Sequence, residues 1–370
     1  MQLAKQILAF AFFFVVSQLR AATPNDWKVV QVDGRDYVSF ANVSQFYQFP
    51  RFTQVNRSVS LASDRSTIRA QVGTSEFFLN TVRFFSDYPL LVHHDENLIS
   101  AIDVAKIIEP VLRPNRISRA KPVTTVVLDP GHGGEDSGTA GPSGTEKEYA
   151  LDVALAAREQ LRRAGLKVEM TRSSDQNVSL GQRVEFANQF SDAVFISLHF
   201  NSAPAGSGIE TYALAPAGVP SNTATEDHPA TTDTQIYPGN EQDAANIALA
   251  AAVHGAILSR VSVFDRGVRH ARFLVLREIK LPAVLVEAGF LNDPNEGARI
   301  ASPYYRQQLG QAIAEAVVTY QRATNFQGNE TIVARAGNLP AHTHSILESL
   351  GASLPEKPPQ TPSALIETSN

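Results

Sequence analysis

Strands and helices alternate along the second half of the chain, and this alternation restricts the possible folds more than any other feature. Apolar runs typical of strands lie at 123–129, 167–171, 193–198 and 283–287. Helical patterns lie at 146–164, 180–190, 243–260 and 304–322. Strands separated by helices of this length form a parallel sheet that is covered on both faces. We therefore predict an α/β fold for residues 123–323, with a mostly parallel, twisted sheet and helices on both faces.

The preceding residues, 28–113, predict a separate small α+β module that is rich in β-strands. The pair Asp33-Gly34 is a hairpin turn signal between two apolar runs, and residues 59–61 and 67–72 alternate with a period of two. Helices are expected at 41–47 and 102–112. The run VDGRDYVSFANVSQFYQF, with VLRPNRI after a helix, resembles the copper amine oxidase N-terminal-like stalk module of secreted bacterial proteins. This resemblance implies neither copper nor oxidase chemistry.

The N-terminal segment, residues 1–22, has the features of a secretion signal. Lys5 precedes an unbroken apolar run of ten residues at 7–16, and Ala21 and Ala22 follow it. A bilayer span needs about 20 residues, so this run is too short to cross a membrane and suits a signal peptide. We expect an exported protein of the periplasm, cell wall or extracellular space, without a stable membrane anchor.

Three further segments are expected to lack regular structure. Residues 114–122 (PNRISRAKP) are basic and bracketed by proline, which predicts a linker. Residues 216–240 are polar and rich in Thr and Pro, which predicts a loop or lid rather than a stable helix. Residues 324–370 are polar and predict a disordered tail.

Composition excludes several classes of function. The chain of 370 residues contains no cysteine, so thiol nucleophiles, disulfides, Cys-ligated zinc and a lipidated cysteine are all excluded. Any metal site must use the carboxylates and the 9 histidines. The 32 Lys and Arg against 37 Asp and Glu give a net charge of −5, which argues against a nucleic-acid partner.

Three of the predicted strands end in polar residues that can bind a metal or move a proton. His132 follows the strand at 123–129, His199 ends the strand at 193–198, and Glu287 ends the strand at 283–287. Ligands of open α/β sheets bind beyond the carboxyl ends of the strands, so these side chains can meet at one edge. A catalytic zinc needs about three protein ligands and an open position. The two histidines therefore require a carboxylate as a third ligand.

The segment GTEKE offers two candidates for that carboxylate. Thr145 and Glu148 fit a capping box, with Thr145 as the N-cap and Glu148 reaching back to it. Glu146 at the first helical position is then free to point toward the strand ends. The spacing alone fits equally well with two ordinary acids that stabilise the first turn of a helix.

Read together, the motifs identify a family. In order along the chain stand VVLDPGHGG, GTEKE, LKVEMTRSSD, ISLHFNSAP, GIETY and FLVLREIKLPAVLVEAGFLND. They resemble the zinc-dependent N-acetylmuramoyl-L-alanine amidases, which cut the bond between the lactyl group of muramic acid and the stem peptide of peptidoglycan. The resemblance implies that His132, Glu146 and His199 bind one Zn²⁺ and that Glu287 is the general base.

These roles imply a hydrolytic mechanism acting on peptidoglycan. Water activated by zinc would lose its proton to Glu287, attack the amide carbonyl, and release the alanine amine after Glu287 returns the proton. His270 and Arg272 are further candidates for contacts with the oxyanion or the substrate. Arg172 and Arg183 are expected to form structural salt bridges.

Two alternatives stay open at this point. A secreted zinc carboxypeptidase or other peptidase would use the same ligands on the stem peptide. A non-catalytic wall-binding protein would keep the fold without the chemistry, but it would not need all four residues. The N-terminal module is a candidate for binding the wall or a protein partner, or for covering the site.

Overall fold

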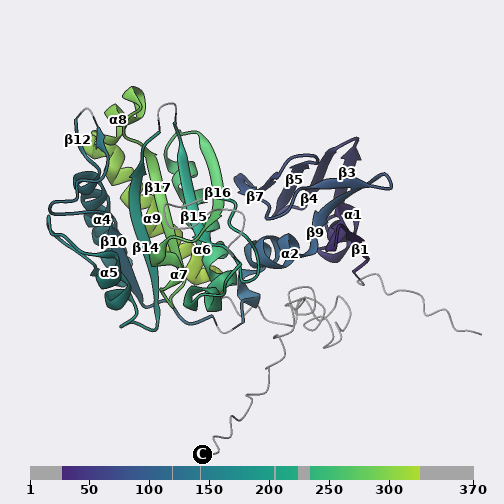
Figure 1. Ribbon diagram of the computed structural model, residues 1–370, viewed down its shortest axis with the longest axis horizontal. Helices are drawn as coiled ribbons and strands as arrows, with labels where there is room; N and C mark the ends of the chain where they lie inside the picture. Colours follow the sequence, from purple (N-terminus) through teal and green to yellow (C-terminus); the bar gives the residue numbers. More distant parts are fainter. Residues whose placement is uncertain (1–26, 119, 142, 204–205, 224–233, 326–370) are drawn as a thin grey trace, which may run out of the picture.

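An 11-stranded sheet runs through both parts of the chain (Figure 1). The structure, a computed structural model, describes residues 27–118, 120–141, 143–203, 206–223 and 234–325. The strand order is β13-β10-β14-β17-β15-β16-β7-β6-β5-β4-β3. The first six of these strands belong to the C-terminal module (residues 123–325), and the last five belong to the N-terminal module (residues 27–113).

The sheet of the C-terminal module is mixed, so the prediction of a mostly parallel sheet was wrong. Its parallel strands are β13 (Lys167–Met170), β10 (Thr125–Pro130), β14 (Ala193–Asn201) and β17 (Ala283–Phe290). Strand β15 (Ile209–Leu214) runs antiparallel to β17, and β16 (Asp265–Ala271) is parallel to β15. The reversal follows from chain length, because residues 202–208 between β14 and β15 are too few for a crossover helix.

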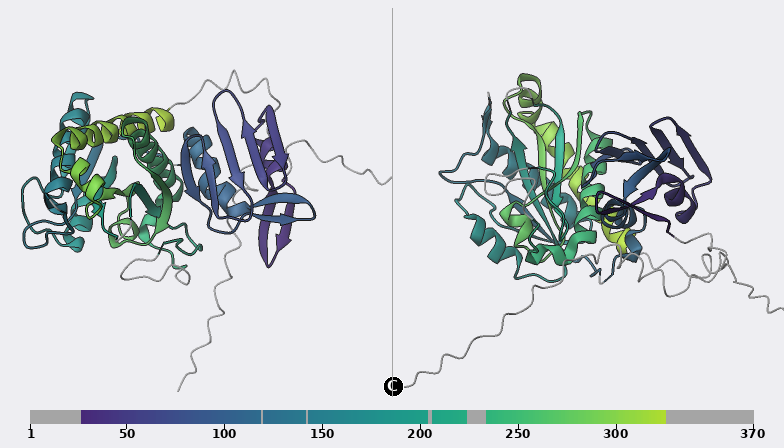
Figure 2. Two further views of the ribbon diagram at one scale, coloured as in Figure 1. Left: turned by 90° about the horizontal axis from the view of Figure 1, so that it is seen from above. Right: turned by 45° about the vertical axis from the view of Figure 1, so that its right-hand side comes forward.

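Helices cover both faces of this sheet, as the alternation predicted (Figure 2). One face packs against α4 (Glu146–Arg163), α6 (Asp243–Arg260) and α9 (Pro303–Asn325). The other packs against α5 (Leu180–Ala187) and α7 (Leu274–Arg277). Successive residues of one strand point to opposite faces, so Val126 and Leu128 join the first core while Val127 joins the second. This double burial explains the unbroken apolar runs in the sequence.

The remaining elements of the C-terminal module are short. They are the hairpin β11 (Ala140–Gly141) and β12 (Gly144–Thr145), the 3₁₀ helix η3 (Pro238–Gln242) and helix α8 (Pro294–Ile300). The predicted loop at 216–240 thus ends in η3, and its residues 224–233 lie outside the described part. Within the described ranges, no helix combines the length and apolarity needed to cross a membrane.

The N-terminal module packs a second, four-stranded sheet and a small helix against strands β3–β7. The strands of the large sheet are β3 (Arg51–Val55), β4 (Ser58–Ala62), β5 (Thr67–Gln71), β6 (Glu76–Leu79) and β7 (Val82–Phe85). The second sheet contains β1 (Val29–Val32), β2 (Arg35–Ser39), β8 (Leu91–His93) and β9 (Glu96–Ser100). The N-terminal module also contains helix α1 (Phe40–Phe46). A continuous helical stretch follows β9 and consists of α2 (Ala101–Asp103), η1 (Val104–Ile108) and α3 (Glu109–Leu112), and the 3₁₀ turn η2 (Pro114–Arg116) comes after it.

Most local predictions for the N-terminal module are confirmed. Asp33 and Gly34 both have positive φ and form the β1–β2 turn, and helices are present near both predicted positions. In the C-terminal module, the apolar run at 273–276 leads into the single helical turn α7 and not into a strand. A four-residue apolar run does not distinguish a strand from a buried helical turn. The predicted signal at 1–22 lies outside the described residues, as does the predicted tail beyond Asn325, where α9 ends.

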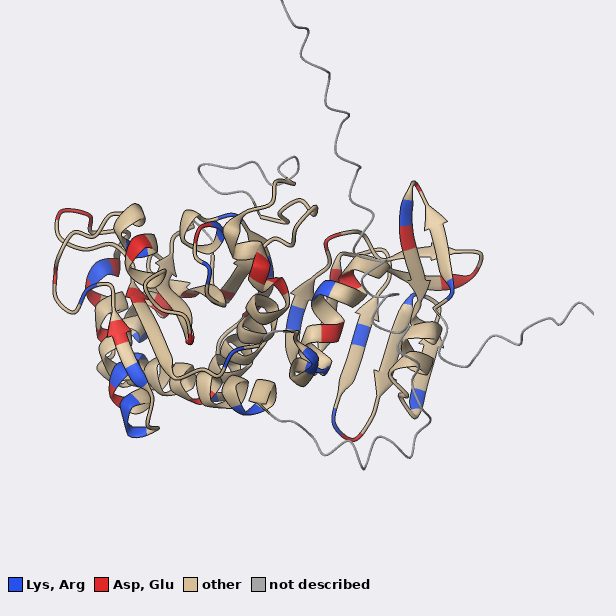
Figure 3. Cartoon of the chain, turned by 90° about the horizontal axis from the view of Figure 1, so that it is seen from below, with Lys and Arg blue, Asp and Glu red and all other residues tan. Residues whose placement is uncertain are grey.

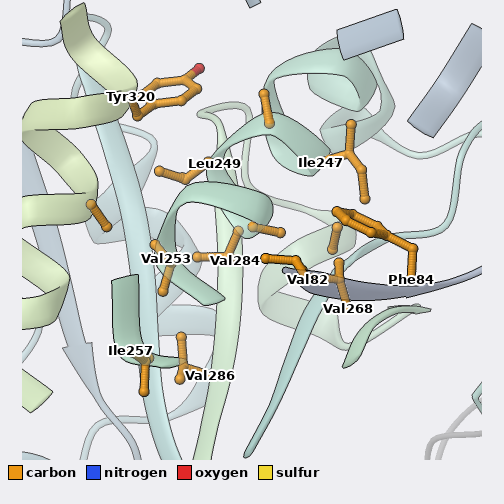
Figure 4. Close-up of a cluster of buried hydrophobic side chains, with 14 of the residues drawn as sticks. Val82, Phe84, Ile247, Leu249, Val253, Ile257, Val268, Val284, Val286 and Tyr320 are labelled. Carbon is orange, nitrogen blue, oxygen red and sulfur yellow. The ribbon is translucent and has the colours of Figure 1, made fainter. Parts of the chain in front are cut away.

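The two modules share a hydrophobic core at the β7–β16 junction. Val268 of β16 pairs with Phe84 of β7 in parallel register. Figure 4 shows Phe84 and Val82 beside Val268 and Ile247, with side chains of β17 and α9 nearby. Phe84 is fully buried. The N-terminal module therefore supplies part of the core that supports α6 and the sheet of the C-terminal module.

This shared core predicts that the two modules unfold together. Phe84→Ala should lower the free energy of unfolding by about 3–5 kcal/mol, the usual cost of removing a buried phenyl ring. Phe52→Ala, at a site that is 37% exposed, should change it by about 0.5 kcal/mol or less. The free energy of unfolding of both variants is measured by urea denaturation, monitored by circular dichroism and by the fluorescence of Trp27. Two separated transitions in the wild type would contradict the shared core.

Candidate metal centre

Four predicted site residues lie at one edge of the sheet. His132 follows β10, Glu146 is the first residue of α4, His199 lies near the end of β14, and Glu287 lies in β17. His199 and Glu287 are directly paired in the parallel register of β14 and β17. Paired residues of parallel strands point to the same face of a sheet. The strand order therefore brings together residues that are far apart in the sequence.

Glu146 and the two histidines form a compact cluster. Oε1 of Glu146 lies 3.0 Å from Nε2 of His132 and 2.8 Å from Nδ1 of His199. One donor atom from each of the three residues fits within 4.8 Å of the others. The imidazole rings are 5.0 Å apart and nearly perpendicular. Two nitrogen donors and one carboxylate oxygen are a ligand set that Zn²⁺ accepts in catalytic sites.

The local sequence explains why Glu146, rather than Glu148, points into this cluster. The predicted capping box is present, and the backbone N–H and the hydroxyl of Thr145 both donate to Glu148 at 2.9 Å. Glu148 is exposed, whereas Glu146 is 3% exposed. The backbone N–H groups of Thr139 and Phe200 donate to Glu146 and fix its carboxylate.

The backbone around the cluster has the conformations that close approach requires. A Cβ atom at Gly131 would lie 2.2 Å from the imidazole of His199, and one at Gly138 would lie 2.5 Å from Oε2 of Glu146. His132 itself has φ of +57°, a sparsely populated region for a residue with a side chain. Such strain persists only where the surroundings enforce it and is common at functional sites.

Asp136, which the sequence analysis did not single out, orients His132. Its Oδ2 lies 2.8 Å from Nδ1 of His132, which leaves Nε2 facing Glu146. A carboxylate on the second ring nitrogen is the usual support for a metal-binding histidine. In the sequence, the position of Asp136 four residues after His132 could have indicated this contact.

The charges in the cluster are strongly coupled. Burial alone would raise the pKa of Glu146, but the hydrogen bonds from His132 and His199 outweigh it and hold that pKa far below its usual range. Burial lowers the pKa of His132, but the contacts with Glu146 and Asp136 raise it overall. Burial raises the pKa of Glu287 well above its usual range, and the nearby carboxylates of Glu146 and Glu210 add to this effect.

Glu287 supplies an independent observation that a cation fits here. Its Oε2 is shielded from solvent and has no hydrogen-bond partner among the described residues. An unsatisfied buried carboxylate oxygen is costly, and a second carboxylate beside it adds repulsion. A bound divalent cation would offset both costs. The donor set, the close-packed glycines and this oxygen therefore all fit a metal ion held by His132, Glu146 and His199.

Glu210, another residue that the sequence analysis did not assign, lies beside Glu287. The two are paired in the antiparallel register of β15 and β17. Glu210 is buried and accepts hydrogen bonds from Asn201, Tyr212 and Arg266 at 2.9–3.0 Å. Its charge is thus compensated, unlike that of Glu287. The motif GIETY was the available signal in the sequence.

Two buried arginines hold the loop that carries His132. Arg183 forms the predicted salt bridge, donating to Asp129 at 2.6 Å, and also donates to the carbonyl oxygen of His132 at 2.8 Å. Arg172 donates to the carbonyl oxygens of Pro130, Gly131, Lys147 and Ser174. The salt bridge predicted for Arg172 is therefore replaced by backbone contacts in the described structure.

His270 and Arg272 are not available to contact a substrate as predicted. Both are at least 98% buried. Nδ1 of His270 lies 2.6 Å from Asp87 of the N-terminal module, and Arg272 donates to Ser221 and to the carbonyl oxygen of Val219. They fix the module junction and the start of the 216–240 loop, which a local sequence pattern cannot reveal because the partners are distant in sequence.

The arginine network predicts a measurable loss of stability. Arg183→Gln should lower the free energy of unfolding by about 3–5 kcal/mol, because it leaves the buried carboxylate of Asp129 without its cation. Arg51→Gln is the matched control, since Arg51 forms an exposed pair with Asp64 at 3.7 Å, and should cost less than about 1 kcal/mol. Chemical denaturation compares the two variants. Equal effects would show that the buried pair does not support the fold.

The chain is similar to known proteins of one family. The sequence profile of the N-acetylmuramoyl-L-alanine amidase family matches residues 126–319, more than half of the chain. The amidase CwlM of Bacillus licheniformis is 31% identical over 234 residues, which cover 63% of this chain and 81% of that protein. AmiA of Escherichia coli K12 is 32% identical over 53% of this chain and 75% of its own length. LytC of Bacillus subtilis is 30% identical over 54% of this chain but only 36% of its own length.

Among solved structures, the amidase AmiC2 of Nostoc punctiforme is 32% identical in sequence. The match covers 54% of this chain and 97% of that one, with a TM-score of 0.45. These matches cover 53–63% of the chain, and the family profile lies within the C-terminal module. The profile match and the relatives show that the chain belongs to the N-acetylmuramoyl-L-alanine amidase family of enzymes.

Proposed function

We propose that this protein is an exported, zinc-dependent hydrolase that cuts the amide bond between N-acetylmuramic acid and the L-alanine of the peptidoglycan stem peptide. The convergence of His132, Glu146 and His199 within 4.8 Å carries this proposal. The family resemblance supplies the bond that is cut. The apolar run at 7–16 supports export to the periplasm, wall or extracellular space. The strand pattern of the N-terminal module supports its relationship to the copper amine oxidase N-terminal-like stalk modules.

In this proposal His132, Glu146 and His199 hold one Zn²⁺, and Glu287 moves the proton. When bound there, zinc would supply Lewis acidity and would lower the pKa of a water molecule to about 7. Glu287 shares a strand register with His199, so its carboxylate lies beside the ligands without being needed among them. It accepts the proton of the attacking water and returns it to the leaving amine of alanine. Glu210 and its arginines border Glu287 on the opposite side.

The arrangement disfavours a non-catalytic wall-binding protein. Such a protein has no use for a buried carboxylate oxygen that lacks a hydrogen-bond partner in the described structure, since a neutral side chain would be more stable there. A zinc carboxypeptidase or other stem peptidase uses the same chemistry on a different bond. The products of the reaction distinguish it from an amidase.

Digestion of purified peptidoglycan tests the bond that is cut. We expect free stem peptides that begin with L-alanine and glycan strands without peptides, both identified by mass spectrometry. Heat-inactivated protein is the control for spontaneous release. Shortened stem peptides that remain attached to muramic acid would contradict the amidase proposal and establish the peptidase.

Substitutions at the centre should separate metal binding from proton transfer. His132→Ala should lose both zinc and activity, whereas Glu287→Gln should retain zinc and lose activity by about 10²-fold or more. Glu148→Gln is the matched control, because Glu148 only caps α4, and it should keep both zinc and activity. Metal content by mass spectrometry and release of stem peptides measure the two properties. A chelator should abolish wild-type activity, and added Zn²⁺ should restore it.

The assignment of the base is wrong if Glu287→Gln hydrolyses peptidoglycan at nearly the wild-type rate. The assignment of the metal ligands is wrong if His132→Ala binds zinc as well as the wild type.

A further inference from the structure

One face of the large sheet continues from the metal centre across the module junction. Tyr212, which faces the α5 and α7 side, pairs with Arg269 in the parallel register of β15 and β16. Across the junction, Val268 pairs with Phe84, and both point to the opposite side. Their neighbours Arg269 and Phe85 therefore point to the same face as Glu210 and Glu287.

The antiparallel registers extend this face over the N-terminal module. Arg83 of β7 pairs with Phe78 of β6, and Phe78 pairs with Arg69 of β5. The alternating residues of these strands, among them Phe77 and Ile68, are buried in the shared core. Arg69 is exposed, and Phe78, Arg83 and Phe85 are partly exposed. This side of the N-terminal module thus faces solvent.

Arginine and phenylalanine side chains alternate on this surface. We call it the arginine face, and it contains Arg69, Arg83, Arg266, Arg269, Phe78, Phe85 and Phe264. The guanidinium of Arg83 lies 5.6 Å from the ring centre of Phe78 and 5.4 Å from that of Phe264, which is 55% exposed. Arg69 lies 5.3 Å from Phe78, and Arg269 lies 3.9 Å from Phe85. Figure 3 shows Lys and Arg bands on the strands of the N-terminal module.

The arginine face carries an excess of positive charge. Glu210 compensates part of the charge of Arg266 and Arg269, and Glu76 lies 3.6 Å from Arg83. Arg69 forms no ion pair among the described residues. Four guanidinium groups thus meet two carboxylates on a surface that belongs to a chain of net charge −5. The local excess is opposite in sign to the charge of the whole protein.

The dimensions of the face suit a polymer rather than a small molecule. Five strand spacings separate β17, with Glu287, from β5, with Arg69. At about 4.8 Å each, they give a surface about 24 Å long. A substrate that extends from the metal centre along the sheet therefore passes over Arg266, Arg269, Arg83 and Arg69 in turn.

We infer that the arginine face binds the carboxylates of peptidoglycan stem peptides and so makes the N-terminal module part of the substrate-binding surface. This inference rests on the proposed function, which places peptidoglycan at Glu287. A peptide ends in a carboxylate, which the planar guanidinium group binds through two parallel hydrogen bonds. The intervening phenyl rings offer apolar contact for the peptide and keep the arginine side chains extended.

Binding to insoluble peptidoglycan tests this inference without requiring catalysis. The Glu287→Gln protein is the background, and Arg69→Gln and Arg83→Gln are added to it singly and together. Co-sedimentation at low salt should show about threefold weaker binding for Arg69→Gln and about tenfold weaker binding for the double variant, as expected for lost charge-assisted hydrogen bonds. Arg162→Gln, an exposed arginine on α4, is the matched control and should bind like the background.

Peptidoglycan whose carboxylates have been converted to amides provides the second comparison. The background protein should bind it about as weakly as the double variant binds native peptidoglycan. Thermal unfolding identifies any variant that fails to fold, and the exposed position of Arg69 makes its single variant decisive. A folded Arg69→Gln protein that binds like the control, or equal binding to amidated and native peptidoglycan, would overturn the inference.

The inference and the proposed function fail in different ways. Arginine-dependent binding without release of stem peptides by the wild type would defeat the proposed function alone. Release of stem peptides together with arginine-independent binding would defeat the inference alone.

Discussion

The buried ion pair between Asp129 and Arg183 is the interaction on which the rest of the site depends. Asp129 ends the apolar part of β10 and accepts hydrogen bonds from Thr171, Arg183 and Ser197. Each donor belongs to a different segment, so one carboxylate ties β10 to β14, to α5 and to the residue after β13. Burying this charge is favourable only because every partner is in place. Arg183 also donates a hydrogen bond to the carbonyl oxygen of His132 and so holds the backbone of that residue in place.

A second set of polar contacts joins the modules around their shared core. His270 contacts Asp87, while the backbone N–H of Asp87 donates to Asp103 at 2.7 Å. Burial and the carboxylate of Asp87 raise the pKa of Asp103 well above its usual range. Nearby, the backbone N–H of Arg83 donates to Asp265, whose other oxygen contacts His254. These directional contacts fix the register that apolar packing alone would leave adjustable.

The sequence predicted the site better than it predicted the sheet. The two histidines and Glu287 follow strand ends, and a capping box separates the roles of Glu146 and Glu148. The spacing alone left the third ligand undecided, and the family resemblance selected Glu146. Strand β16 was missed because Arg266, Arg269 and His270 interrupt its apolar pattern. Each of them contacts an acid that is distant in sequence, Glu210 or Asp87. Strand β15 was not predicted either, and its direction depends on which strand pairs with it.

Strand β16, which the sequence analysis missed, contributes both to the shared core and to the arginine face. Strand β16 carries Val268 on one side, into the shared core, and Arg269 on the other, onto the arginine face. Because successive residues alternate, the core contact that fixes the N-terminal module also fixes which side its arginines face. A shift of one residue in the β7–β16 register would bury Arg83 and expose Phe84. The hydrophobic core therefore enforces the orientation of the charged surface, and the rigid attachment of the N-terminal module follows from the same constraint.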